Sequence, residues 1–247
     1  MLGKIKNKTL KISYEYKQKK IDENYNYNVL KKLDLNEKKI KKVLENNKLS
    51  FGDIKLSWHY HLFAGFSNKI SKKKILEIGT HKGEFTNFIS KIFLSSNIYT
   101  IDIPIDHQNF NHSYSRKNIK SYNDSYFKYR QDQIKKKNIK FIQSDSINLL
   151  KLFKKNYFDL IWIDGDHKNP QVSIDIFNSI YLAKKNAIIM VDDIILDNKE
   201  TKNSNSDSYK FLKFCEKKKL LKKHLLIKRV NPNNLLIKKY IAVCIKL

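Results

Sequence analysis

Acidic residues stand at the ends of five short apolar runs in this sequence. The runs are rich in Ile, Leu and Val, and carboxylates are poor strand and core residues. Any one of these side chains could simply cap a following helix. Five of them at equivalent points indicate instead a polar site where the runs end. The acidic positions are Glu77, Asp102, Asp145, Asp164 and the pair Asp192-Asp193.

The first run leads into the pattern E-x-G-x-x-x-G, which begins at Glu77 and ends at Gly83. Gly79 lets the backbone turn sharply, and Gly83 lets a helix begin close to a ligand. The G-x-G-x-x-G pattern of dinucleotide-binding proteins is absent, because His81 and Lys82 stand where glycines would admit a pyrophosphate. The loop therefore favours a cofactor without phosphates and disfavours a nicotinamide oxidoreductase.

Two of the later carboxylates suit the nucleoside part of such a cofactor. Asp102 ends NIYTID, where it can accept hydrogen bonds from ribose hydroxyls. Asp145, in FIQSDS, can accept a hydrogen bond from an adenine amino group. The order of the glycine loop and these two residues is more specific than any of the three alone.

The segments LEIGTHKGEFT, IYTID, FIQSDS and FDLIWIDGDH, in this order, resemble class I S-adenosylmethionine (SAM)-dependent methyltransferases. EIGTxxG followed by IDGDH and a VDD strand end is similar to the metal-dependent sugar and antibiotic O-methyltransferases that include the macrocin, mycinamicin and novobiocin enzymes. The resemblance covers roughly residues 55 to 195. It implies O-methylation of a small hydroxylated acceptor, such as a sugar or another polyol.

The resemblance also implies roles for individual residues. Those expected to line the methionyl end of SAM are Glu77, Gly79, Thr80 and Gly83. Asp102 would hold the ribose, and Asp145 and Ser146 would meet the adenine. The implied ligands of a divalent cation are Asp164, Asp192 and Asp193, while His167 and Asp164 would form the catalytic pair, with His167 as general base.

The residue types are consistent with that chemistry. Three carboxylates at the ends of adjacent strands can converge and suit Mg²⁺ or a similar hard cation. A metal-bound hydroxyl has a lowered pKa, and an imidazole with a pKa near 6.5 can take its proton. The simpler alternatives are that VDD only caps a strand end and that His167 is an ordinary loop histidine.

The elements that must position these residues follow from the hydrophobic pattern. From residue 72, five apolar runs alternate with amphipathic stretches, which predicts βαβ units and a Rossmann-like parallel sheet with helices on both faces. The last runs, HLLIKRV and LLIKKYIAVCIKL, flank a turn at Pro232 and predict an antiparallel hairpin. The prediction is a seven-stranded α/β methyltransferase domain over 55–247, preceded by an N-terminal helical extension over 1–54.

Composition narrows the function classes further. The formal net charge is +26, but the lysines are spread over almost every segment and Arg116, Arg130 and Arg229 are the arginines. This favours a solvated basic surface over a nucleic-acid interface, for which arginine is the better donor. The alternatives are an RNA methyltransferase and a non-catalytic SAM-binding protein. We expect a cytoplasmic protein, because no signal peptide or membrane span is recognisable. The sequence also allows a homo-oligomer.

Two further segments leave alternatives open. The motif Trp58-His59-Tyr60-His61 could offer a metal-binding pair, but a packed helix or lid is favoured because no third ligand stands nearby. The aromatic and basic stretch 104–130 could shape an acceptor pocket or be an ordinary loop and helix. Cys215 and Cys244 lack the spacing of a zinc site or a disulfide framework.

Overall fold

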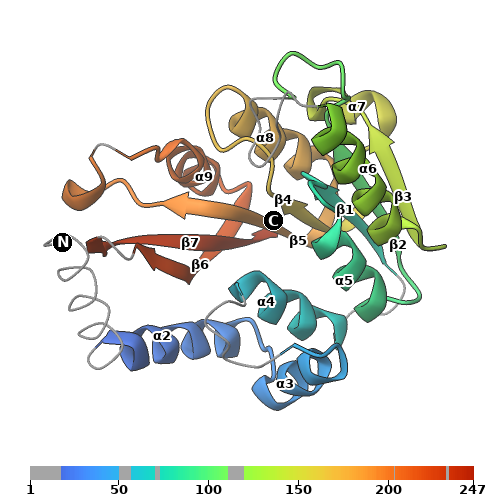
Figure 1. Ribbon diagram of the computed structural model, residues 1–247. Helices are drawn as coiled ribbons and strands as arrows, with labels where there is room; N and C mark the ends of the chain where they lie inside the picture. Colours follow the sequence, from blue (N-terminus) through green and yellow to red (C-terminus); the bar gives the residue numbers. More distant parts are fainter. Residues whose placement is uncertain (1–17, 50–56, 70–72, 111–119, 203, 232–233) are drawn as a thin grey trace, which may run out of the picture.

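A single seven-stranded sheet organises the computed structural model, which describes residues 18–49, 57–69, 73–110, 120–202, 204–231 and 234–247 (Figure 1). The strand order is β3-β2-β1-β4-β5-β7-β6. The strands are β1 (Lys74–Ile78), β2 (Asn97–Asp102), β3 (Ile139–Gln143), β4 (Phe158–Ile163), β5 (Ala183–Ile195), β6 (Leu221–Asn231) and β7 (Asn234–Lys246). This is the Rossmann-like architecture that the alternating pattern predicted.

Strands β1 to β5 pair in parallel, β7 runs against them, and β6, antiparallel to β7, runs in the same direction as β1 to β5. The predicted antiparallel pairing of the last two runs is confirmed. β7 lies between β5 and β6 and pairs antiparallel with both, so β6 forms the edge of the sheet. Long side chains of β6 can reach β5 across this inserted strand.

Helices cover both faces of the sheet (Figure 1). One face packs against α7 (Leu149–Leu152), α8 (Gln171–Leu182) and α9 (Asp207–Lys217), and its core includes Leu76 and Ile176. The other packs against α2 (Lys19–Lys32), α3 (Glu37–Asn46), α4 (Trp58–Ser67) and α5 (Glu84–Ile92), and its core includes Ile75 and Phe63. The remaining helical elements are α6 (Lys120–Ile134), η2 (Ser146–Asn148) and η3 (Lys199–Thr201). The neighbours Ile75 and Leu76 pack on opposite faces because side chains alternate along a strand.

The N-terminal helices share a core with the sheet. Leu30 of α2 and Ile40 of α3 are buried in the same cluster as Leu226 of β6 and Ile241 of β7. The sequence predicted a boundary between residues 54 and 55, which lie outside the described residues, and the two-part division stays a prediction. α2 nevertheless packs against β6 on this face of the sheet, and α3 packs against α4 (Figure 1).

Both cysteines are buried free thiols. Burial raises the pKa of Cys215 to about 11 and the pKa of Cys244 further. Thiols held in the protonated form are poor nucleophiles and metal ligands. Within the described ranges, no helix combines the length and apolar character needed to cross a bilayer.

Candidate functional site

The loop between β1 and α5 draws two strand ends together. Gly79 has a φ of 100° and Gly83 a φ of 76°, both in the left-handed region that favours glycine. The backbone N–H of Gly79 donates to the carbonyl of Ile101 at 2.9 Å. A Cβ atom on Gly79 would lie 2.2 Å from the backbone oxygen of Asp164. The ends of β1 and β4 therefore meet this closely because residue 79 has no side chain.

Glu77 supports this loop from within the sheet. It lies inside β1, one residue before the strand ends, and only 1% of it is exposed. Its Oε2 accepts hydrogen bonds from the hydroxyls of Thr86 at 2.5 Å and Thr100 at 2.6 Å. The Thr100 hydroxyl also lies 2.6 Å from that of Thr80. Burial raises the pKa of Glu77 to about 7, although the two hydrogen bonds partly oppose the shift.

Replacing Glu77 with glutamine is expected to flatten the pH dependence of stability between about pH 4.5 and pH 7. The pKa is raised from its ordinary 4.5 to about 7 in the folded state, so folding favours the protonated form. That stabilisation is complete below pH 4.5 and is lost as the pH rises through 7, by about 3 kcal/mol. Urea unfolding at several pH values measures it, with Glu45→Gln on the exposed side of α3 as control. Parallel curves for wild type and Glu77→Gln would contradict the shift.

Asp102 is the last residue of β2 and is fixed by its surroundings. Its Oδ2 accepts the backbone N–H of His81 and its Oδ1 that of Ile103, both at 2.9 Å. Nη1 of the buried Arg130 lies 3.8 Å from Oδ2, and its guanidinium stacks over the ring of Phe141 at 4.6 Å. A carboxylate has about four acceptor sites, and ribose hydroxyls are donors of the kind that it accepts.

Asp145 and Ser146 follow the end of β3. Asp145 caps the short helix η2 by accepting the N–H of Ile147 at 2.9 Å, and its Oδ2 lies 3.3 Å from Nε2 of His107. The hydroxyl of Ser146 accepts a hydrogen bond from Nε2 of Gln171 at 2.7 Å. The helix-cap alternative therefore holds for Asp145. Its second oxygen faces a histidine of the segment that follows β2.

Asp164 and His167 form an acid–imidazole pair just beyond β4. Nε2 of His167 lies 3.6 Å from Oδ1 of Asp164. Although 38% of the Asp164 side chain is exposed, desolvation and the nearby charge of Asp192 raise its pKa well above the ordinary value. Burial lowers the pKa of His167, although Asp192 and Asp193 oppose the shift. A neutral imidazole in this position can accept a proton.

The VDD segment was predicted to end a strand, but it lies inside β5, which continues to Ile195. The pairing of β5 with β7 shifts register between Val191 and Ile194, so Asp192 and Asp193 form a bulge. Asp192 is 1% exposed, and its Oδ1 is buried without a hydrogen-bond partner among the described atoms. Asp193 has a φ of 51°.

Basic side chains from β6 and β7 surround these two carboxylates. Nζ of Lys228 pairs with Oδ2 of Asp192 and lies 2.9 Å from Oδ1 of Asp193. Oδ2 of Asp193 also pairs with Lys239 and lies 3.3 Å from Nη2 of Arg229. Burial would raise the pKa of Asp193, but Lys228 and Lys239 hold it well below its usual range. Burial would lower the pKa of Lys228, but Asp192 and Asp193 outweigh that effect and raise it.

This arrangement does not fit the predicted divalent cation. A hard cation needs carboxylate oxygens that are free to coordinate it. Here the ammonium of Lys228 lies between Asp192 and Asp193, and a second and a third cationic side chain contact Asp193. Within the ranges that the structure describes, no three His, Cys, Asp or Glu side chains are grouped so that they could hold a metal ion.

The structure brings some of the predicted residues together. Asp164, His167, Asp192 and Asp193 influence one another's charge just beyond β4 and at the bulge in β5. Gly79 joins them through its contact with Asp164. Asp102 and Asp145 lie beyond β2 and β3, where residues of the segment after β2 contact both of them.

Sequence reasoning missed Lys228, and it left His107 and Arg130 within a segment of undecided role. Lys228 carries no signal in a chain with lysine in almost every segment. Trp58-His59-Tyr60-His61 forms the start of α4, as the packed-helix interpretation favoured, and His59 stacks at 5.4 Å from the ring of Trp162. Burial lowers the pKa of His59 to about 3, despite the opposing charge of Asp192.

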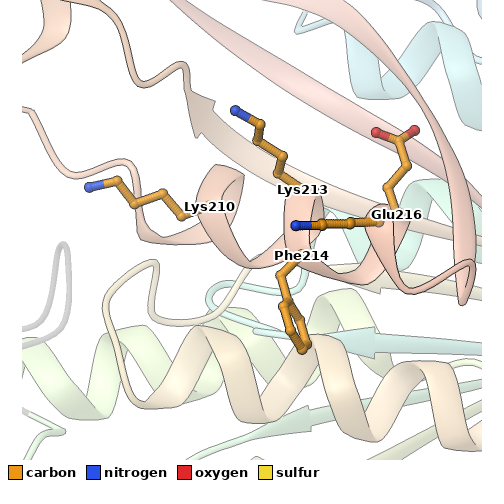
Figure 2. A pocket seen from close by; sticks show the side chains of 5 residues that line it. Lys210, Lys213, Phe214 and Glu216 are labelled. Carbon is orange, nitrogen blue, oxygen red and sulfur yellow. The ribbon is translucent and has the colours of Figure 1, made fainter.

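A hollow along α9 lies apart from these residues. Figure 2 shows its lining side chains, of which Lys210, Lys213, Phe214 and Glu216 are labelled, all carried by α9. None of them is a predicted site residue, and Glu216 pairs with Lys223 of β6. A second hollow, lined by Lys82, Glu84, Ser125, Tyr126 and Tyr129, lies beside the glycine loop. The second hollow is therefore the one that adjoins the predicted site.

A protein family matches the part of the chain that carries the predicted site residues. Residues 76–194 match a family described as a methyltransferase domain. The matched range begins in β1 and ends in β5, so it spans the glycine loop and every predicted site residue. No protein with a curated function matches the sequence.

Solved structures share the fold at low sequence identity. An O-methyltransferase from Bacillus cereus, in complex with SAH, is 17% identical, with a TM-score of 0.54 over 90% of this chain and 96% of that one. The O-methyltransferase TomG from Streptomyces achromogenes, involved in tomaymycin synthesis and in complex with SAM, is 14% identical, with a TM-score of 0.56 over 91% and 98%. These similarities show the class I methyltransferase fold.

Proposed function

We propose that this chain, which has the class I methyltransferase fold and matches a methyltransferase domain over residues 76–194, uses SAM to methylate a hydroxyl oxygen of a small acceptor such as a sugar or another polyol. The observation that carries the proposal is the Asp164–His167 pair, which directly adjoins Gly79 of the glycine loop. An imidazole beside a carboxylate is suited to take the proton of a hydroxyl. The family match to residues 76–194 supports the methyl transfer itself.

The residues present fit SAM as the donor. We assign its methionyl part to the loop of Gly79, Thr80 and Gly83, with Glu77 holding that loop from inside the sheet. We assign the ribose hydroxyls to Asp102, at the end of β2, and the adenine to Asp145 and Ser146, which follow β3. When bound, SAM supplies an electrophilic methyl group, whose bond to sulfur breaks as its bond to the acceptor oxygen forms.

His167 takes up the proton of the acceptor hydroxyl in this step, and Asp164 supports it. Nε2 of His167 accepts the proton of the acceptor hydroxyl, and the electron pair left on oxygen forms the new bond to carbon. Asp164, 3.6 Å away, stabilises the resulting imidazolium in its ionised form, and the imidazolium charge in turn opposes the desolvation that raises the pKa of Asp164. The sulfonium loses its charge as a neutral thioether, so charge and atoms balance. Holding both reactants in place supplies much of the acceleration.

Oxygen as the acceptor atom is supported by two structural neighbours whose names say O-methyltransferase. The sugar or polyol acceptor is supported by the resemblance of the EIGT, IDGDH and VDD segments to sugar O-methyltransferases. The predicted divalent cation stays a prediction and takes no part in the step above, since Lys228 and Lys239 already pair with its expected ligands.

Calorimetric titration with SAM, followed by transfer of a labelled methyl group to a panel of sugars and polyols, tests the proposal. We expect SAM to bind and the label to appear in an ether. Asp102→Asn should weaken SAM binding by about 10- to 100-fold, the value of a charge-assisted hydrogen bond. Asp106→Asn, an exposed neighbour, should leave binding unchanged. Absence of SAM binding, or transfer to RNA alone, would overturn the proposal.

A further inference from the structure

Two irregular strand segments place Lys228 against the carboxylates of β5. The register of β6 with β7 shifts between Ile227 and Arg229, so Lys228 stands at a bulge, as Asp192 and Asp193 do in β5. β7 lies between these strands, which puts their backbones roughly 10 Å apart. A lysine side chain can cross much of that gap, and only 11% of this one is exposed.

Asn26 of α2 holds the bulge in β6. Its side-chain amide donates to the backbone oxygen of Ile227 at 2.8 Å, and its Oδ1 accepts the N–H of the same residue at 2.8 Å. Asn26 is 1% exposed. A buried amide that satisfies both backbone groups of one residue fixes the strand there. The position of Lys228 is thus set by the backbone and by a helix from the start of the chain.

The basic side chains around Asp192 and Asp193 disfavour binding of a divalent cation there. Lys228 donates to Asp192 and to Asp193, and Asp193 is also paired with Lys239. A divalent ion seated among the same oxygens would lie within a few ångströms of a buried ammonium and would be repelled. An ammonium has three N–H donors, of which these two carboxylates take two.

We propose that Lys228 takes the place of a divalent cation, neutralising Asp192 and Asp193 together with Lys239 and donating a hydrogen bond to the acceptor oxygen, so that methyl transfer needs no metal ion. This rests on the proposed O-methylation. As the acceptor proton passes to Nε2 of His167, negative charge develops on the oxygen, and a fixed ammonium stabilises it. No oxidant, reductant or other reactant is needed.

Electron paramagnetic resonance of Mn²⁺ added to the full chain tests whether Lys228 replaces a divalent cation, and this measurement needs no acceptor. Wild type should bind no Mn²⁺ at this site, whereas Lys228→Ala frees Oδ2 of Asp192 and Oδ1 of Asp193 and should bind it with a rise in melting temperature. Asp193→Asn, added to Lys228→Ala, should abolish that binding and so locate it. Lys228→Arg, which keeps the charge, and Lys222→Met, an exposed lysine of the same strand, should both behave as wild type.

Methyl transfer with a chelator present completes the test. Wild type should keep its full rate, while Lys228→Met should lose about 100-fold or more in kcat with SAM affinity unchanged. The inference would be overturned if wild type binds Mn²⁺ and Asp193→Asn removes that binding, while a chelator abolishes methyl transfer and added Mn²⁺ restores it. This outcome can be read even if the Lys228 variants fail to fold. Absence of SAM binding would instead defeat the proposed function and leave the Mn²⁺ result standing.

Discussion

Replacing Gly79 with alanine is expected to destabilise the protein by about 3 kcal/mol or more, at the severe end for a single substitution. The added Cβ would lie 2.2 Å from the backbone oxygen of Asp164 and 2.8 Å from its carbonyl carbon. These are backbone atoms, so no side chain can turn away to relieve the clash. The φ of 100° adds strain of its own for any residue with a Cβ. Urea unfolding of the two proteins measures the loss.

The same substitution should weaken SAM binding in whatever fraction remains folded, because separating the ends of β1 and β4 moves the loop away from Asp164. Gly165→Ala is the matched control, since a Cβ there would meet its nearest neighbours, Asp175 and Ile78, at 3.4 Å. That control should cost little stability. A Gly79→Ala protein as stable as Gly165→Ala would show that the strand ends are not held as described.

Replacing His167 with alanine is expected to lower kcat for methyl transfer by about 100- to 10,000-fold, the usual contribution of a general base. Nε2 lies 3.6 Å from Asp164, so the variant loses both the proton acceptor and the partner of that carboxylate. Steady-state kinetics with saturating SAM measure the change. The affinity for SAM should stay within about threefold, because the role assigned to His167 is toward the acceptor.

His224→Gln provides the control for this second prediction. His224 lies on β6, paired with Val243 of β7, and has no assigned role in the site. Its variant should keep the wild-type rate. If His167→Ala retained kcat across the pH range in which wild type is active, the proton would be taken by another group, and His167 would be the ordinary loop histidine that the sequence also allowed.

Local patterns in the sequence were sufficient to predict the fold and the line of strand ends. Runs such as KILEI and FDLIWI are nearly all apolar because both faces of a central parallel strand are buried, and this leaves a readable signal. The glycines of the first loop are equally readable, because few other residues adopt their backbone angles. Asp164 and Asp102 follow such runs directly, so their shared edge of the sheet was predictable.

Long-range pairing decided what surrounds the acidic residues. Asp192 and Asp193 were predicted to be metal ligands from the resemblance and from their expected place at a strand end beside Asp164, whereas the structure brings Lys228 and Lys239 to them from 36 and 46 residues away. Their arrival depends on β7 inserting between β5 and β6 and on bulges in two strands. A bulge shifts side chains by one residue, and no local pattern marks it among so many lysines. The sequence by itself therefore determined the sheet and its acidic edge, and only the tertiary structure decided which cation those carboxylates hold.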